Sequence, residues 1–176
     1  MSLLQLDQIR KPLPFDKNNG LCIGNIRAIL EGRIKFDFEV FLPELNKTLQ
    51  RPLVWTLLQK QELILSILKG NKLPYMAFVM NDDTNVYQVI DGKQRLNAIL
   101  EFGNNKFPLE VDGKTYFFNC LSQDAVMYFK RYMIEGNVAY ESRLGYMRDS
   151  YKRSWFEQIN FSGTEQDKDH LIYLNS

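Results

Sequence analysis

A predicted β-hairpin that runs directly into a helix is the strongest constraint on how this chain folds. Residues 75–80 and 86–90 are apolar and rich in β-forming side chains, and the polar segment between them has the composition of a hairpin loop. The second strand leads without a break into residues 91–100, whose apolar side chains recur at helical spacing until Gly103. The sequence therefore predicts a strand, a sharp turn and a helix in immediate succession.

Other periodic segments predict a mixture of helices and strands. Thr56 is a suitable N-cap for an amphipathic helix that ends at Gly70, and Ser122 is a suitable cap for another. Asp112 and Gly113 form a strong hairpin signal. The remaining predicted elements are a helix over 23–31, a strand over 36–42, strands over 107–111 and 115–118, an edge strand at 138–140, and helices over 144–159 and 166–174.

Strands gathered in the middle of the chain with helices around them predict the α+β class. We expect residues 1–20 to form an N-terminal arm and residues 21–121 to form the core. Residues 122–176 are expected to form a helical C-terminal extension packed on that core.

Composition and charge restrict the function classes. The chain has 22 basic and 21 acidic side chains and is 45% hydrophobic, which is typical of a globular protein without a broad basic surface. Any anion site must therefore be local. One histidine and two cysteines exclude a zinc site, and Cys22 and Cys120 are expected to be free, buried thiols in a reducing cytoplasm. No signal peptide or membrane-length apolar run is evident.

The turn at residues 91–95, DGKQR, has the residue types of a small phosphate cradle. A helix N-terminus presents unpaired N–H groups and a partial positive charge. Gly92 permits close approach of a ligand to the backbone, while Lys93 and Arg95 add cationic donors. A purely structural alternative stays open, in which Asp91 caps the helix and Gln94 completes a capping-box-like pair.

A second candidate segment precedes the helix that follows Thr56. Gln50 and Arg51 lead into an extended run with Pro52, and Arg51 is spaced to stack on Trp55 or to reach an anion. The structural alternative is that Arg51 packs against the surface indole of Trp55 and binds no ligand. The DGKQR turn, which follows a strand, and Arg51, which precedes a helix, can lie on the two sides of one cleft.

These segments together resemble a known family. Residues 49–55 (LQRPLVW), 63–70 (LILSILKG) and 89–96 (VIDGKQRL), in this order, resemble the DGQQR family of ParB/sulfiredoxin-like domains, which form the N-terminal domain of GmrSD-type restriction systems. The similarity covers roughly residues 20–120, and residues 156–164 (FEQINFSGT) look like that family's segment with an asparagine before Gly-Thr.

The resemblance implies a ParB/sulfiredoxin-like fold whose turn binds the phosphates of a nucleoside triphosphate, with Mg²⁺ and hydrolysis, and with modified DNA as the target of the whole system. The resemblance places phosphate binding at Gln50, Arg51, Gly92 and Arg95, which match the family, and at Lys93, which departs from it. It also implies Asp91, Gln94 and Arg95 as catalytic positions.

Two departures from the family pattern bear on activity. Lys93 stands where the family has glutamine, and a lysine cannot orient an attacking water as an amide can, so binding is retained more easily than hydrolysis. The longer members carry a His-Asn-His nuclease domain, which a chain with His170 as its one histidine cannot contain. DNA cleavage would then need a separate nuclease subunit.

The alternative function is a DNA-binding, nuclease or interaction module without nucleotide turnover. Basic and aromatic side chains are mixed in the C-terminal third, a combination that can follow a phosphate backbone, although an ordinary solvated helix face explains it too. Exposed aromatic side chains there leave a homodimer open. Asp82 and Asp83 are interpreted as turn formers rather than as Mg²⁺ ligands. The residues of the mixed surface are Tyr128, Lys130, Arg131, Tyr132, Arg143, Tyr146, Arg148, Tyr151, Lys152, Arg153 and Trp155.

Overall fold

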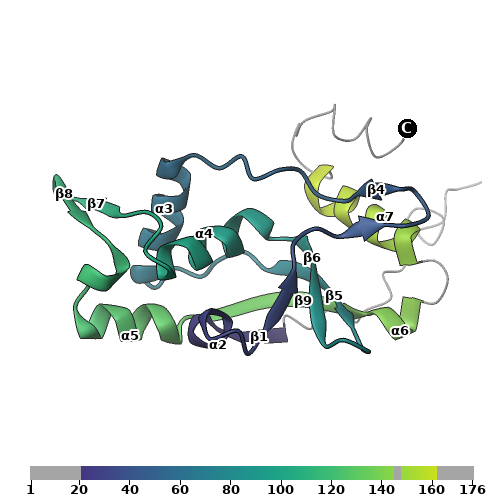
Figure 1. Cartoon of the computed structure of the whole chain (residues 1–176), viewed down its shortest axis with the longest axis horizontal. Helices are drawn as coiled ribbons and strands as arrows, with labels where there is room; N and C mark the ends of the chain where they lie inside the picture. The colour runs from purple at the N-terminus through teal and green to yellow at the C-terminus, as the bar shows by residue number, and fades with distance from the viewer. Residues whose placement is uncertain (1–20, 145–147, 162–176) are drawn as a thin grey trace, which may run out of the picture.

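A five-stranded mixed sheet forms the centre of the computed structural model, which describes residues 21–144 and 148–161 (Figure 1). Its strand order is β1-β9-β5-β6-β2. The hairpin strands β5 and β6 are antiparallel, β9 is parallel to β5 and antiparallel to β1, and β2 is parallel to β6. The strands are β1 (Leu21–Asn25), β2 (Lys35–Asp37), β5 (Met76–Asn81), β6 (Val86–Asp91) and β9 (Met133–Tyr140).

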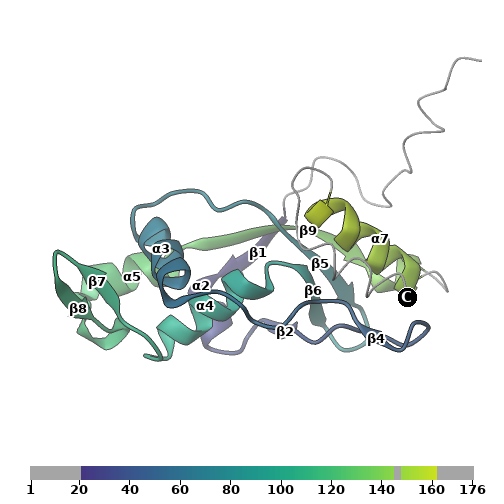
Figure 2. The same cartoon turned by 90° about the horizontal axis from the view of Figure 1, so that it is seen from above.

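Helices surround this sheet and confirm the predicted α+β class. In both views α3, α5 and a small hairpin, β7 with β8, lie at one end of the molecule, and α7 lies at the other (Figure 1, Figure 2). Figure 1 shows α6 at the same end as α7. The helices are α2 (Ile26–Leu30), α3 (Leu57–Leu68), α4 (Lys93–Gly103), the 3-10 helix η1 (Phe118–Cys120), α5 (Gln123–Arg131), α6 (Glu141–Leu144) and α7 (Arg148–Phe161). The short strands are β3 (Phe41–Leu42), β4 (Lys47–Thr48), β7 (Leu109–Val111) and β8 (Lys114–Tyr116).

The core is divided between the two faces of the sheet because successive strand side chains point to opposite sides. In β5, Met76 and Phe78 pack with α2, α3, α4 and α5 on one face, whereas Ala77 and Val79 pack with α7 on the other. Phe78 and Val79 both have no exposed surface. The sheet is therefore covered on both faces, and the C-terminal helices form one of the two covers.

Local sequence signals position several elements as predicted. The Thr56 hydroxyl accepts a hydrogen bond from the Gln59 backbone N–H, and the Gln59 side chain accepts one from the Thr56 N–H, so α3 begins with a complete capping box. Ser122 caps α5 in the predicted way. Asp112 and Gly113 both adopt positive φ, 52° and 71°, which is the geometry that a two-residue hairpin turn between β7 and β8 requires.

Other predictions were wrong. Residues 21–25 form β1, and the helix begins only at Ile26 because the Asn25 side chain caps it. The strand predicted over 36–42 is split between β2 and β3. The edge strand predicted at 138–140 is part of β9, which begins at Met133 and lies inside the sheet between β1 and β5. Glu135, Gly136 and Asn137 in the middle of β9 interrupt the apolar pattern by which a buried strand is recognised in a sequence. The strand is buried because it pairs with β1 on one side and β5 on the other.

Both cysteines are free as expected, but they are exposed rather than buried. The helix predicted over 144–159 is seen as α6 and α7, with residues 145–147 outside the described part of the chain. The helix predicted over 166–174, and His170 within it, also lie outside the described residues. Within the described residues, none of the helices has the length and apolar character needed to span a membrane.

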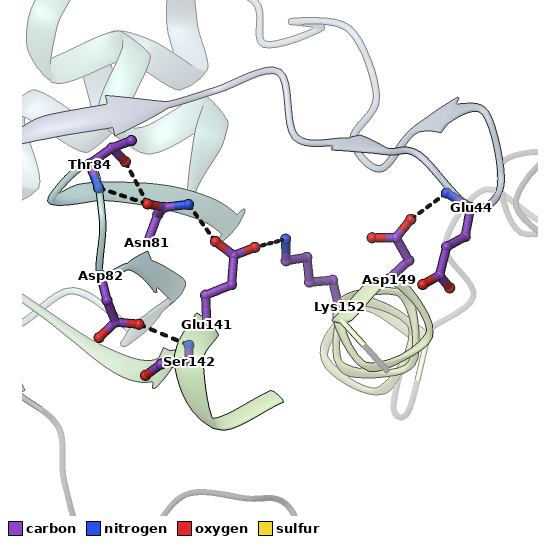
Figure 3. Close-up of polar contacts among 8 residues, drawn as sticks. All are labelled: Glu44, Asn81, Asp82, Thr84, Glu141, Ser142, Asp149 and Lys152. Atoms are coloured by element: carbon purple, nitrogen blue, oxygen red, sulfur yellow. Dashed lines mark hydrogen bonds and ion pairs between the residues drawn. The ribbon is translucent and has the colours of Figure 1, made fainter. Parts of the chain in front are cut away.

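Polar contacts hold α6 and α7 against the rest of the molecule (Figure 3). The Lys152 ammonium lies 2.9 Å from the Glu141 carboxylate, and both side chains are buried, with 4% and 10% exposed. The second Glu141 oxygen accepts a hydrogen bond from the Asn81 side chain at the end of β5. Asp149 accepts one from the Glu44 backbone N–H at 2.8 Å. These contacts hold α7 against the sheet face formed by Ala77, Val79 and Ile90. The end of α7 that carries Phe156 and Asn160 lies beside the turn between β6 and α4.

Candidate functional site

A cleft of about 230 Å³ lies beside the turn between β6 and α4. It brings together the two segments that the sequence suggested would converge, and each of the candidate residues at 50, 51 and 91–95 lines it. The full lining is Gln50, Arg51, Trp55, Ile90, Asp91, Gly92, Lys93, Gln94, Arg95, Phe156 and Asn160.

Gly92 shapes the turn and leaves the start of α4 without a side-chain cap. Its φ is 112°, and a Cβ at this position would lie 2.7 Å from the Met76 sulfur, so glycine is required for both conformation and space. Asp91 was expected to be the N-cap, but Gly92 occupies that position, and a glycine has no side chain that could accept from the first turn. The N–H groups at the start of α4 are therefore suited to an anion.

Asp91 instead pairs with Arg95. The Arg95 Nη2 lies 2.6 Å from the Asp91 carboxylate, and the Nη1 donates to the Pro74 carbonyl oxygen at 2.6 Å. The Arg95 side chain is only 14% exposed. These two contacts hold the guanidinium plane in place while leaving further N–H donors for a ligand. Arg95 is thus a preorganised donor rather than a mobile surface charge.

Lys93 is almost completely buried, and its ammonium forms an ion pair with the exposed side chain of Glu39. The Lys93 Nζ lies 2.6 Å from the Glu39 carboxylate, and the two side chains are 8% and 73% exposed. The sequence did not associate Glu39 with this turn, because residue 39 lies 54 positions earlier in the chain. A phosphate bound at the turn would compete with Glu39 for the lysine.

Gln94 connects the two segments of the cleft. Its side-chain oxygen accepts hydrogen bonds from the backbone N–H groups of Val54 at 3.2 Å and Trp55 at 3.3 Å. Its amide nitrogen donates to the Pro52 carbonyl oxygen at 2.9 Å. Both amide atoms are used in this way, so the capping-box interpretation was wrong. In this structure Gln94 positions the segment that carries Arg51 and Trp55.

Gln50 has the least satisfied side chain in the cleft. It is 8% exposed, and among the described residues neither Oε1 nor Nε2 has a hydrogen-bond partner. A buried, unpartnered amide is costly, so its presence in a cleft indicates a polar ligand. This observation is independent of the helix N-terminus and of the nearby cations.

Two lining residues from α7 were missed as site residues. Phe156 is 5% exposed, and Asn160 donates from its side chain to the Phe156 carbonyl oxygen at 2.8 Å. A signal for them existed, because both lie in the segment 156–164 that resembles the DGQQR family. They reach the cleft because α7 folds back over the sheet, which the linear pattern does not indicate.

The other sequence candidates that the structure describes are not among the residues that line the cleft. Asp82 accepts a hydrogen bond from the Ser142 backbone N–H at 2.9 Å, and this bond lowers the pKa of its carboxyl. No cluster of metal-ligating side chains was found in residues 21–144 and 148–161. The mixed basic and aromatic surface is not continuous, because Lys152 and Trp155 within it are buried, with 3% exposed for each. The burial of these residues weakens the DNA-binding alternative.

Comparison with protein families places most of the chain in a known family. Residues 30–175 match the model of the GmrSD restriction endonuclease, N-terminal domain. Neither the curated proteins nor the solved structures that were compared contain a match. The matched range includes every lining residue of the cleft.

Proposed function

The chain belongs to the family of GmrSD restriction endonuclease N-terminal domains, and from this premise we propose that it binds a nucleoside triphosphate in the cleft at the β6–α4 turn. The family identifies the chain as a module of restriction and phage-defence systems. Nucleotide binding would make it the sensing domain of such a system, acting in the cytoplasm with a separate nuclease subunit.

One observation carries the proposal, namely that every feature suited to phosphate meets in the same cleft. The first turn of α4 has no side-chain cap, and Lys93 and Arg95 belong to that same turn. Arg51 comes from a distant segment of the chain and lines the same cleft. Helix N–H groups and arginine donors together are a common arrangement for phosphate oxygens.

A magnesium ion fits this cleft only as a companion of the nucleotide. Asp91 is the one carboxylate among the lining residues, and it already pairs with Arg95. Mg²⁺ usually takes one or two protein carboxylates and completes its ligands with phosphate oxygens and water. Asp91 would supply such a contact, directly or through water, and the phosphates would supply the rest.

Binding of a nucleoside triphosphate at this cleft does not require that the chain also hydrolyses it. Asp91, Gln94 and Arg95 remain the candidate catalytic residues. However, both amide atoms of Gln94 are used to hold residues 52–55, which leaves it poorly placed to orient an attacking water. Phosphate release measured with each nucleotide and Mg²⁺ would test whether turnover accompanies binding.

Isothermal titration calorimetry with the four nucleoside triphosphates and Mg²⁺ tests the proposal. We expect binding by the wild type and its loss in Arg95→Ala, because the guanidinium is removed and Asp91 is left as an unpaired negative charge in the cleft. Arg33→Ala is the matched control, since Arg33 is exposed and pairs with Glu31 away from the cleft lining. Absence of binding for all four nucleotides at millimolar concentration would contradict the proposal.

A folding control separates lost binding from lost structure. Leu96 follows the turn directly and has no exposed surface. Leu96→Ala should lower the free energy of unfolding by about 2–5 kcal/mol, as large-to-small core substitutions do. We expect Arg95→Ala to keep the cooperative unfolding of the wild type, so that its loss of binding can be assigned to the site.

A further inference from the structure

Gln50 has a hydrogen-bonding requirement that phosphate oxygens cannot meet. Its amide offers a donor at Nε2 and an acceptor at Oε1, and both atoms are buried without a partner among the described residues. Phosphate oxygens that carry no proton only accept hydrogen bonds, so they can pair with Nε2 but leave Oε1 unsatisfied. A ligand that satisfies Gln50 must therefore both donate and accept beside the phosphates.

Comparison with another buried glutamine shows that Gln50 is unusual. Gln61 in α3 is 7% exposed, and its amide nitrogen donates to the Pro108 carbonyl oxygen at 2.9 Å. Within the described part of the chain, Gln50 is the only side chain with two buried polar atoms that lack a partner. The fold therefore satisfies one buried glutamine and leaves the one that lines the cleft unsatisfied.

We propose that Gln50 recognises the ribose hydroxyls of the bound nucleotide, an inference that rests on the proposed function. Oε1 accepts from one hydroxyl, and Nε2 donates to the oxygen of the other. A ribose hydroxyl is both a donor and an acceptor, so the pair of hydroxyls meets both requirements of the amide. Gln50 is then a specificity-determining residue, because it makes the cleft bind a nucleotide more tightly than a polyphosphate without a sugar.

The size of the cleft favours the sugar over the base as the group beside Gln50. Its volume of about 230 Å³ is smaller than the roughly 300–1,000 Å³ of pockets that enclose a drug-sized ligand. Phosphates at the Gly92 turn and the adjoining sugar would use most of this space. The base would then lie at the rim, where Trp55 is partly exposed.

Titration calorimetry of the full chain with Mg²⁺ tests this assignment. The ligands are ribonucleoside triphosphates, their 2′,3′-dideoxy analogues and inorganic tripolyphosphate. We expect the wild type to bind the ribonucleotide about tenfold more tightly than the dideoxy analogue, the effect of losing one or two neutral hydrogen bonds. Gln50→Met should bind both with similar affinity, whereas the matched control Gln61→Met should keep the wild-type ratio.

Thermal unfolding without ligand provides a second measurement. Gln50→Met removes an unsatisfied buried amide and should raise the melting temperature, whereas Gln61→Met removes a satisfied hydrogen bond and should lower it. If Gln50→Met does not fold, Gln50→Glu replaces it. The carboxylate still accepts from hydroxyls, so the preference for ribose should remain while the affinity for every phosphate ligand falls.

The outcomes distinguish this inference from the proposed function. Equal affinity of the wild type for ribonucleotide, dideoxy analogue and tripolyphosphate would leave the phosphate site intact and overturn the role of Gln50. A preference for one base with no effect of the hydroxyls would assign the amide to a base edge and overturn the ribose assignment. A ribose preference that persists in Gln50→Met would also overturn it. Failure of every ligand to bind would remove the proposed function itself.

Discussion

The Glu39 carboxylate lies 2.6 Å from the Lys93 ammonium and joins an exposed loop to the buried side of the β6–α4 turn. The lysine is 8% exposed and the glutamate 73% exposed, so most of the desolvation falls on the cation. A lysine in this environment needs a negative partner. Glu39 supplies one in the structure, and a phosphate could supply another.

Glu39→Gln should therefore make the turn more dependent on an anion. We expect the free energy of unfolding without ligand to fall by about 1 kcal/mol, because the glutamate is mostly exposed to solvent. The affinity for a triphosphate should rise severalfold, because its oxygens no longer compete with the carboxylate. Unfolding in phosphate-free buffer and calorimetry measure these effects. Glu110→Gln, an exposed acid on β7, is the control, and a weaker affinity in Glu39→Gln would contradict the prediction.

Gln94→Ala should loosen the segment that carries Arg51 and Trp55. The substitution removes hydrogen bonds to the backbone at Pro52, Val54 and Trp55, and we expect a loss of about 1–2 kcal/mol in the free energy of unfolding. Hydrogen exchange at the Val54 and Trp55 amides should become faster.

Gln94→Glu separates the two halves of this interaction. Its carboxylate can still accept from the Val54 and Trp55 N–H groups, but it cannot donate to the Pro52 carbonyl oxygen. Its stability and exchange rates should be intermediate. Gln123→Ala, an exposed glutamine at the start of α5, is the control. Wild-type exchange rates in Gln94→Ala would show that other contacts hold the segment.

Lys152→Met should destabilise the attachment of α7. It leaves the buried Glu141 carboxylate without its ammonium partner, and the removal of one partner from a buried pair costs about 3–5 kcal/mol. Because Phe156 and Asn160 on α7 line the cleft, ligand affinity should fall as well. Denaturant unfolding and calorimetry measure the two effects.

Lys152→Met/Glu141→Gln tests the cause of that loss. Removal of the unpaired charge should restore part of the stability, while the side-chain oxygen of the new glutamine can still accept from Asn81. A double variant as unstable as Lys152→Met would mean that the buried charge is not the source of the effect.

The pair of Lys60 with Glu101, 2.7 Å apart, should make the packing of α3 on α4 depend on pH. Burial alone would raise the pKa of the Glu101 carboxyl, but the hydrogen bond from Lys60 and the positive charges of Lys60 and Lys106 outweigh it and lower the pKa below the usual 4.5. A carboxyl with a lowered pKa contributes stability above its unfolded pKa, and this contribution is lost as the pH falls through the folded pKa.

Lys60→Met should therefore be less stable than the wild type at pH 7, by up to about 1 kcal/mol. The difference should disappear at low pH, where Glu101 is protonated in both proteins. Unfolding curves between neutral and strongly acidic pH measure it. Lys114→Met, an exposed lysine on β8, should show no such change with pH. A constant difference across the range would contradict the role of the Lys60–Glu101 pair.

Local chemistry explains why part of the fold could be predicted. Thr56, Ser122 and the pair Asp112-Gly113 act through neighbours within a few residues, so the capped helices and one hairpin follow from short stretches of sequence. Strand β9 could not be recognised in this way. Its residues become buried only by pairing with β1 and β5, which lie far away in the chain.

The same division applies to the candidate site. The amino-acid sequence by itself determined the α+β class, the strand–turn–helix unit and two of the three segments that line the cleft, because these depend on periodicity and turn chemistry. Only the tertiary structure decided how each side chain is used. Lys93 pairs with Glu39, and Gln94 forms hydrogen bonds with the backbone of residues 52–55. Asn160 reaches the cleft from α7, and the amide of Gln50 has no hydrogen-bond partner among the described residues. Each of these depends on groups distant in sequence, and burial, which sets the cost of an unpaired polar group, exists only once the chain has folded.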